Sequence, residues 1–428
     1  MTRDRSVGLG ESPLSATWRP QVVEPAVLVG IDPAGDLASL DECEALAATA
    51  GAEVVGRLVQ ARAAADPATF VGKGKLQELH DVVHASNAGL VVFDDELSPG
   101  QLRKLEDRLG VEVIDRTALI LDIFALHARS REGKMQVELA QLNYLLPRLR
   151  GWGEAMSRLG GGIGTRGPGE TKMEVDRQHI RRRISKLRRD IADLSRTRDV
   201  KRAGRERSGI PHVALAGYTN AGKSTLMNAL VEADVLVADQ LFATLDPTVR
   251  RLKLPGGRAV TVSDTVGFVR KLPHDLVEAF RSTLEEVVRA SLIVHVADGA
   301  APDVEDQIAA VREVLGQIGA AAIPEVLAMN KADLLSEVDA ARLRRRFPDA
   351  VFVSALRGQG LEELTAAVEA SLPVAEIEVE LFVPYEAQDV VARLHREADV
   401  RTAEPSDEGT RMRVRMGERE LSWASPYL

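Results

Sequence analysis

The stretch Val213-Ala-Leu-Ala-Gly-Tyr-Thr-Asn-Ala-Gly-Lys-Ser-Thr-Leu-Met-Asn-Ala-Leu230 decides the fold of the central part of the chain. It predicts a short buried strand, a loop bounded by glycines, and the start of a helix. Residues 217–224 match the pattern G-x-x-x-x-G-K-[ST] at every fixed position. In such a loop the glycines let the backbone approach a ligand closely, and the N–H groups point at phosphate oxygens. Lys223 would supply a cation for the terminal phosphates and Ser224 a hydroxyl for magnesium, which favours a nucleotide site over a plain turn.

The composition is that of a large globular chain. Its 428 residues are enough for about three domains. The single cysteine, Cys43, cannot form an internal disulfide, and no apolar run is long enough to cross a bilayer. Without a secretory signal, we expect a soluble cytoplasmic monomer with no integral membrane segment, and peripheral membrane association is left open. The formal net charge of −9 disfavours nonspecific binding of polyanions by the whole surface.

The N-terminal part predicts a small α/β domain. Residues 1–20 lack periodicity and are expected to form a disordered tail before a domain over residues 21–117. Strands and helices of ordinary length alternate in this domain, which predicts a largely parallel sheet. Gly72-Lys-Gly-Lys75 lacks the full spacing of a phosphate loop. The sequence therefore favours a lysine-bearing turn there, with a helix from Leu76, and leaves a second nucleotide site open.

Residues 118–207 change to long helical runs broken by the glycine-rich segment 160–169. Apolar residues recur at spacings of three and four on both sides of the break, as on one face of a helix. The second helix is expected over residues 174–197. The two apolar seams are Met135, Leu139, Leu142 and Leu145, and Ile180, Ile184, Leu187, Ile191 and Leu194. They predict an antiparallel helical hairpin with a glycine-rich tip, packed seam to seam.

The second helix of this hairpin is strongly basic in an otherwise acidic protein. Residues 177–207 contain thirteen Lys or Arg against four Asp or Glu, and eleven of the thirteen are arginine. The planar guanidinium suits phosphate recognition, and no aromatic residue is interleaved for base stacking. The pattern favours contact with the phosphates of structured RNA over a merely solvated face. The candidate RNA contacts are Gly162, Thr165, Arg166, Arg181, Arg182 and Arg183.

Residues 208–373 form a second α/β domain around the phosphate loop, and two later segments have the character of switches. Leu241-Phe-Ala-Thr-Leu-Asp-Pro-Thr248 follows the first helix, and a threonine there could reach magnesium in a loop ordered by a γ-phosphate. Val260-Thr-Val-Ser-Asp-Thr-Val-Gly267 is a strand that ends in D-x-x-G. Asp264 is expected to hold magnesium through water, and the Gly267 N–H to sense the γ-phosphate.

Val326-Leu-Ala-Met-Asn-Lys-Ala-Asp333 predicts which base is bound. The Asp333 carboxylate can accept hydrogen bonds from both the N1–H and the exocyclic amine of guanine. Adenine lacks these two donors and would leave the carboxylate unpaired. Asn330 and Lys331 are expected to brace the base and the phosphate loop. A turn at Ser354 and Ala355 would bring the Ala355 N–H to the guanine carbonyl.

Together these motifs define the residues expected to contact GTP or GDP. The phosphate loop and helix start contribute Gly217, Tyr218, Thr219, Asn220, Ala221, Gly222, Lys223, Ser224 and Thr225. The two switches contribute Phe242, Ala243, Thr244, Leu245 and Asp246, and Asp264, Thr265, Val266 and Gly267. The loops that read the base contribute Asn330, Lys331, Ala332, Asp333, Ser354, Ala355 and Leu356.

The motifs resemble those of a known family. Residues 208–373 are similar to the translation-factor-related P-loop GTPases, and residues 26–372 resemble the HflX family of ribosome-associated GTPases. The stretches that carry the resemblance are Val71-Gly-Lys-Gly-Lys75, Asp115-Arg-Thr-Ala-Leu-Ile-Leu-Asp-Ile-Phe124, Gln136-Val-Glu-Leu-Ala-Gln-Leu-Asn-Tyr144, Gly160-Gly-Gly-Ile-Gly-Thr-Arg-Gly-Pro-Gly-Glu-Thr171, Gly217-Tyr-Thr-Asn-Ala-Gly-Lys-Ser-Thr225, Phe242-Ala-Thr-Leu-Asp-Pro247 and Asp264-Thr-Val-Gly-Phe268.

The resemblance implies a partner and a role. Such a protein would bind the large ribosomal subunit, hydrolyse GTP, and help to split or rescue stalled ribosomes under stress, with the hairpin entering ribosomal RNA. The family pattern selects Thr244 over Thr248 as the magnesium ligand beside Ser224. Asn220 matches the asparagine of potassium-dependent relatives, so K⁺ is a second candidate cofactor beside Mg²⁺.

One position predicts slow intrinsic hydrolysis. After D-x-x-G, where Ras-like proteins orient water with glutamine, the chain has Phe268, which carries no polar side-chain atom. A partner is therefore expected to complete the site. The alternative function is a GTP-dependent regulatory switch that acts on a protein partner and uses the basic hairpin for docking.

Residues 374–428 predict a small C-terminal α/β domain. Residues 377–383 and 412–416 alternate like strands, and residues 385–397 have a helical pattern. Nothing in this segment indicates a function.

Overall fold

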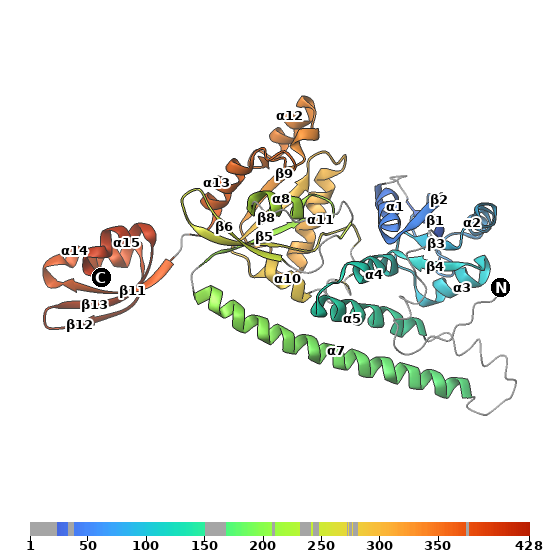
Figure 1. Ribbon diagram of the computed structural model, residues 1–428, viewed down its shortest axis with the longest axis horizontal. Coiled ribbons are helices and arrows are strands. Elements are labelled where there is room, and N and C mark those ends of the chain that lie inside the picture. Colours follow the sequence, from blue (N-terminus) through green and yellow to red (C-terminus); the bar gives the residue numbers. More distant parts are fainter. Residues whose placement is uncertain are drawn as a thin grey trace.

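In the computed structural model, three sheets with their own helices are arranged along the molecule, and one long helix runs beneath two of them (Figure 1). No helix in the described part of the chain is both long and apolar enough to cross a membrane. The structure describes residues 24–32, 38–149, 168–207, 210–231, 241–242, 248–271, 273, 276, 281–373 and 376–428.

The N-terminal sheet has the predicted parallel arrangement. Its elements are β1 (Glu24–Ile31), α1 (Ala38–Ala50), β2 (Ala52–Gln60), α2 (Lys73–Ser86), β3 (Leu90–Phe93), α3 (Pro99–Leu109) and β4 (Glu112–Asp115). The strand order is β2-β1-β3-β4, with every neighbouring pair parallel. Side chains alternate along β1: Leu28 faces the cluster that contains α1, and Val29 faces the cluster that contains α2 and α3. Both faces of this sheet are therefore buried.

Residues 72–75 form the N-cap and the start of α2, so the helix predicted from about Leu76 begins three residues earlier. Gly72 is the extended N-cap residue, and its backbone N–H donates to Gln60 Oε1 at 2.9 Å. Lys73 is already the first helical residue. The helix starts early because a glycine at the cap position costs little there.

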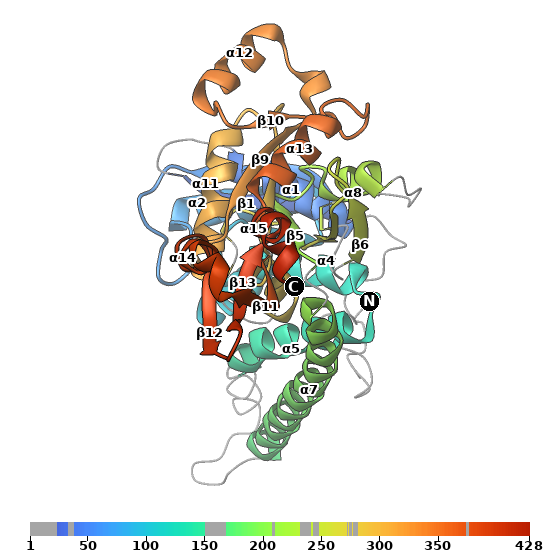
Figure 2. The same cartoon turned by 90° about the vertical axis from the view of Figure 1, so that its left-hand side faces the viewer.

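The predicted helical hairpin is present between α5 (Arg131–Arg148) and α7 (Pro168–Arg207). Most of the two predicted seams meet in one cluster, which contains Leu139, Leu142, Ile184 and Leu187. Leu145 was wrongly placed in the seam: it packs against the cluster of α1 and α4, and Leu146 packs in the hairpin instead. α7 is longer than the predicted 174–197 and extends through the basic stretch. Figure 2, viewed from the side of the C-terminal domain, shows it below α5. The predicted glycine-rich tip lies outside the described residues.

A separate helix, α4 (Arg116–His127), precedes the hairpin and crosses the boundary predicted between residues 117 and 118. It packs with α1 on the N-terminal sheet, and Ile120 and Phe124 are buried there. Because α4 carries buried residues on most of its faces, its sequence shows no narrow seam that could have distinguished it from the hairpin.

The central domain has a six-stranded sheet of order β10-β9-β8-β5-β7-β6. All neighbours are parallel except β6 and β7, as expected for a mostly parallel sheet. β5 lies inside the sheet, so its carboxyl end and the loop after it are placed at the centre of one edge. The elements are β5 (His212–Gly217), α8 (Lys223–Val231), β6 (Thr248–Lys253), β7 (Ala259–Asp264), α10 (Arg281–Val288), β8 (Leu292–Asp298), α11 (Val304–Gln317), β9 (Glu325–Asn330), η2 (Ala332–Leu334), α12 (Glu337–Arg346), β10 (Val351–Phe352) and α13 (Leu361–Ser371).

The C-terminal domain is an antiparallel sheet of order β11-β13-β12 with helices packed on it. Its main elements are β11 (Glu376–Pro384), α14 (Gln388–Glu397), β12 (Asp399–Pro405), β13 (Gly409–Gly417) and α15 (Glu418–Ala424). The two strands and the helix predicted there are present. β12 was not predicted, because it is an edge strand whose residues are mostly exposed and therefore show no apolar alternation.

Candidate functional site

The phosphate loop has the predicted strand–loop–helix geometry. β5 ends at Gly217 and α8 begins at Lys223. Gly217 has φ +155°, and a Cβ there would lie 2.1 Å from the Val296 carbonyl oxygen. Gly222 has φ +90°, and its Cβ would lie 2.2 Å from Asn330 Nδ2. Both positions therefore require glycine, for steric as well as conformational reasons.

Lys223 is buried inside this loop. Its Nζ donates hydrogen bonds to the carbonyl oxygens of Gly217 at 3.1 Å and Tyr218 at 2.8 Å. Burial lowers the pKa of the ammonium to about 8, and the nearby Asp264 charge opposes that shift. The loop carbonyls thus hold the cation at the place where a phosphate would meet the helix N-terminus.

Two predicted magnesium-binding groups lie together. Ser224 Oγ donates to Asp264 Oδ2 at 2.5 Å, and Asp264 is 3 % exposed. The hydroxyl lies at the start of α8 and the carboxylate at the end of β7. Both are hard oxygen donors, which suit Mg²⁺. Thr244, the other predicted ligand, lies outside the described residues together with Ala243, Leu245 and Asp246.

The D-x-x-G segment packs directly on the phosphate loop. The Thr219 N–H donates to the Phe268 carbonyl at 2.7 Å, and the Phe268 N–H donates to the Gly217 carbonyl at 3.1 Å. A Cβ on Gly267 would lie 3.0 Å from Lys223 Nζ. Gly267 and Lys223 therefore face the same small volume, where a γ-phosphate is expected.

Phe268 points into the core of the domain and is 1 % exposed. The side chain after D-x-x-G thus serves packing and presents no group to a water molecule at the phosphate. Val266 and Thr265 are also buried, and Thr265 Oγ1 donates to the Leu215 carbonyl at 2.6 Å.

The residues predicted to read guanine converge on the other side of the loop. Asn330 Nδ2 donates to the Ala221 carbonyl at 2.8 Å, and Asn330 Oδ1 accepts from the Ala355 N–H at 3.0 Å. Lys331 pairs with Asp298 at 2.7 Å. Asp333 is exposed on the short helix η2. Asn330 therefore joins the phosphate loop to the turn at Ser354 and Ala355.

Three further predicted residues differ in exposure. Ser354 is fully buried, and its Oγ accepts from the Arg357 N–H at 3.1 Å. Leu356 is 77 % exposed beside it. Asn220 is exposed at the tip of the phosphate loop with φ +58°, a conformation that asparagine tolerates better than most residues.

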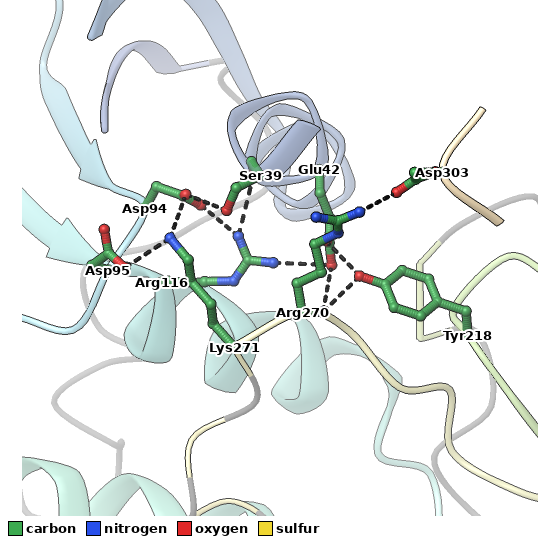
Figure 3. A network of polar contacts seen from close by, with 9 residues as sticks. All are labelled: Ser39, Glu42, Asp94, Asp95, Arg116, Tyr218, Arg270, Lys271 and Asp303. Atoms are coloured by element: carbon green, nitrogen blue, oxygen red, sulfur yellow. Dashed lines mark hydrogen bonds and ion pairs between the residues drawn. The ribbon is translucent and has the colours of Figure 1, made fainter. Parts of the chain in front are cut away.

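A polar network between the N-terminal domain and this site was not predicted (Figure 3). Tyr218 Oη donates to Glu42 Oε2 at 2.6 Å, and the Arg270 N–H lies 2.6 Å from Tyr218 Oη and 3.2 Å from Glu42 Oε1. Arg116 lies between Glu42 at 2.9 Å and Asp94 at 2.5 Å. The sequence offered no signal for these contacts, because 176 residues separate Glu42 from Tyr218.

The outer part of the network extends from the same backbone segment. Lys271 pairs with Asp94 at 3.1 Å and with Asp95 at 2.7 Å, and Arg270 pairs with Asp303 at 2.6 Å. Consecutive residues of one loop thus hold acidic groups of both domains.

Apolar side chains reinforce this contact. Phe242 from the first switch region and Val266 and Val269 from the second belong to the same buried cluster as α4 and α5. The Phe124 and Phe242 rings meet edge to face with centroids 4.6 Å apart. Phe242, Val266 and Val269 are therefore packed against the N-terminal part of the chain.

The basic helix α7 carries the predicted arginines on its exposed side. Arg181 and Arg182 are exposed, and Arg183 makes a bidentate ion pair with Glu138 on α5 at 2.6 and 2.7 Å. Gly162, Thr165 and Arg166 lie outside the described residues. A cleft of about 530 Å³ between the helices is lined mainly by basic residues: Arg129, Arg131, Lys134, Met135, Arg183, Lys186, Leu187 and Asp190.

The fold and the site define a P-loop GTPase, because the phosphate loop, the D-x-x-G segment and the N-K-x-D loop meet at one edge of a mostly parallel sheet. Family models match three consecutive regions: a GTP-binding GTPase N-terminal region at residues 37–125, a GTP-binding GTPase middle region at residues 127–205, and a 50S ribosome-binding GTPase domain at residues 212–331.

Relatives that match most of the chain identify the particular family. The chain is 53 % identical to the GTPase HflX of Caldanaerobacter subterraneus subsp. tengcongensis over 365 residues, which are 85 % of this chain and 84 % of that protein. It is 47 % identical to the GTPase HflX of Escherichia coli (strain K12) over 336 residues, 78 % of this chain and 79 % of the relative. The chain belongs to the HflX family of GTPases.

Proposed function

We propose that this GTPase binds the large ribosomal subunit through α7 and couples GTP binding and hydrolysis to the splitting or rescue of stalled ribosomes under stress. The observation that carries the proposal is the array of exposed arginines on α7, a helix of 40 residues that runs beneath two of the domains, in a protein with a net charge of −9 (Figure 1). The family model that matches residues 212–331 is named for 50S ribosome binding, which supports the same partner. Such a protein acts in the cytoplasm as a monomer.

The chemistry at the site is positioning and charge stabilisation. The amides of the phosphate loop and Lys223 would hold the β- and γ-phosphates, and Gly267 would contact the γ-phosphate from the opposite side. Ser224, Asp264 and Thr244 are the residues proposed to hold Mg²⁺, which would neutralise phosphate charge when bound. Asp333 would select guanine, with Asn330 fixing the distance between base loop and phosphate loop.

We expect isolated large ribosomal subunits to raise the GTPase rate about tenfold or more. The reason is that Phe268 is turned into the core, so the position after D-x-x-G offers no polar side chain to orient water and a partner has to supply that function. Steady-state phosphate release with and without subunits measures the effect. Subunits pretreated with RNase are the control, and an undiminished activation after that treatment would favour the alternative of a regulatory switch with a protein partner.

Replacing Arg181 and Arg182 together with alanine should weaken binding to the large subunit about tenfold, while GTP affinity stays the same. The slope of the logarithm of the binding constant against the logarithm of the salt concentration should become less steep by about 1 to 2. Arg183 is kept, because its pair with Glu138 fastens α7 to α5. Co-sedimentation at several salt concentrations measures both effects. An Arg342→Ala and Arg345→Ala double variant, which removes two exposed arginines from α12, is the matched control. Equal binding by both variants would show that this face of α7 is only solvated.

A potassium ion is the proposed second cofactor, and Asn220 its proposed protein ligand. Asn220 is exposed in the phosphate loop, three residues before Lys223. A cation there would add positive charge where negative charge develops in the transition state. Turnover should be several-fold faster in potassium than in sodium buffer of equal ionic strength, and Asn220→Ala should abolish the difference. Equal rates in both buffers would rule the ion out.

A further inference from the structure

We propose that His80 and His84 on helix α2 of the N-terminal domain form a binding site for one divalent transition-metal ion of the class of Zn²⁺, Cu²⁺ and Ni²⁺. The two imidazoles lie one helical turn apart, and their Nε2 atoms are 3.0 Å from each other. This inference goes beyond the proposed function, because it concerns another face of the protein and another class of ion than the Mg²⁺ of the nucleotide site.

The spacing of this pair is unusual in the chain. Of the eight histidines in the sequence, only His80 and His84 are four residues apart. On an α-helix, side chains at positions i and i+4 lie on the same face, and two histidines at this spacing can bind one zinc ion. α2 extends from Lys73 to Ser86, so both residues belong to a regular helix. The helix backbone by itself therefore holds the two rings in position.

The distance between the two nitrogens fits a shared metal ion. A Zn–N bond is about 2.0–2.1 Å long, which places two bound nitrogens about 3.3 Å apart at a tetrahedral angle and about 2.9 Å apart at a right angle. The observed separation of 3.0 Å lies between these two values. The ring planes are inclined by 62°, so the rings are not stacked face to face. A small adjustment of the two side chains would admit the ion.

Asp81 has the position of an outer partner of the site. Its Oδ1 lies 3.4 Å from His80 Nδ1, the ring nitrogen that does not face His84, and it accepts a hydrogen bond from Gln77 Nε2 at 3.0 Å. A carboxylate beside Nδ1 favours the tautomer in which Nε2 carries the lone pair, and it makes that nitrogen a stronger ligand. The same carboxylate adds negative charge close to the cation.

The site is accessible to a hydrated ion and separate from the GTPase domain. The side chains of His80 and Asp81 are 38 % and 69 % exposed, and His84 is exposed as well. The buried residues of α2, Leu79 and Val83, pack on the face of the N-terminal sheet opposite to the one that contacts the GTPase domain. Figure 1 accordingly shows α2 on the side of its domain that is turned away from the central sheet.

The histidines would supply two ligands, and water would complete the coordination. In the part of the chain that the structure describes, no group of three or more His, Cys, Asp or Glu side chains is placed to hold a metal ion. Two of the four ligands of a structural zinc site provide about half of its binding free energy, which gives a Kd for Zn²⁺ of about 1–200 µM. Imidazole nitrogen suits Zn²⁺, Cu²⁺ and Ni²⁺, and Cu²⁺ should bind more tightly than Zn²⁺.

The test uses the full-length chain without a polyhistidine tag. The protein is freed of metal with a chelator, loaded with Mg²⁺ and GDP, and separated from unbound nucleotide before calorimetric titration with Zn²⁺ and with Cu²⁺. His80→Ala and His84→Ala should each weaken binding at least about fiftyfold, because one of two protein ligands is lost. Asp81→Asn should weaken binding less than either histidine substitution, because it removes only an outer partner.

Electron paramagnetic resonance of bound Cu²⁺ identifies the ligands directly. The spectrum of the unmodified chain should show coupling to two nitrogen nuclei, and the spectra of His80→Ala and His84→Ala coupling to one. Melting temperatures of the metal-free variants verify that they fold. If one of the two does not, the copper spectrum of the other decides by the same criterion.

His395→Ala is the matched control. His395 is an exposed histidine in the last turn of α14, where the residues four positions away are Val391 and Asp399. This variant should bind Zn²⁺ and Cu²⁺ as the unmodified chain does. Equal metal affinity of His84→Ala and the unmodified chain would overturn the proposal, as would the absence of saturable binding of Zn²⁺ up to about 1 mM. The two rings would then share only a hydrogen bond.

Discussion

Asp333→Asn should lower the affinity for GTP by about a hundredfold or more and create binding of xanthosine triphosphate. The Asp333 carboxylate is exposed on η2. Under the proposed function it accepts hydrogen bonds from the N1–H and the exocyclic amine of guanine when the base is bound. An asparagine amide can accept from only one of these donors, and its NH₂ group opposes the guanine amine. In xanthine that amine is replaced by a carbonyl oxygen, which the NH₂ group can meet.

The measurement is equilibrium binding of fluorescent GDP and competition by GTP, ATP and xanthosine triphosphate. Glu337→Gln removes a carboxylate from the first turn of the neighbouring helix α12 and serves as the control for the loss of one negative charge. If Asp333→Asn bound GTP as tightly as the unmodified chain, guanine would have to be recognised elsewhere.

Asn330→Ala should weaken nucleotide binding by about thirtyfold or more. The Asn330 side chain is 2 % exposed and bonds the Ala221 carbonyl and the Ala355 N–H, which belong to the phosphate loop and to the base-reading turn. Its removal leaves two buried backbone groups without this partner, at about 1–3 kcal/mol each. It also removes the bridge that sets the distance between the two halves of the site.

Calorimetric titration with GDP and thermal unfolding without nucleotide should be compared for this variant. A loss of affinity larger than the loss of stability is expected if Asn330 mainly aligns the two loops. Gln317→Ala, on the exposed side of α11, removes a side-chain amide that donates to Glu313 of the same helix, and it is the control. Affinity within twofold of the unmodified chain would contradict the bridging role.

Much of the GTPase domain could be predicted because its motifs are local. The spacing from Gly217 to Ser224 encodes a turn between strand and helix, and both glycines occupy positions where a Cβ would collide with backbone or with Asn330. The apolar run of β5 predicted a buried strand, and parallel order followed from the alternation of strands and helices. Seam residues of α5 and α7 predicted their contact in the same way.

The errors occurred where local pattern and tertiary packing diverge. α4 is buried on most sides and so lacks the one-sided seam that would separate it from the hairpin helices. β12 is held in its sheet by backbone pairing to β13 rather than by buried side chains. The pattern of apolar residues therefore indicates neither where α4 ends and the hairpin begins nor that β12 is a strand.

The sequence by itself determined that the protein binds guanine nucleotides at a phosphate loop, because that chemistry is specified by residues at short, fixed spacing. It also determined the basic character of α7, which is a matter of composition. Only the tertiary structure decided that Phe268 turns into the core, that Arg183 is paired with Glu138, and that Glu42 reaches Tyr218. The physical reason is that these contacts join segments far apart in the chain, and their partners are set by how the helices and sheets pack against one another.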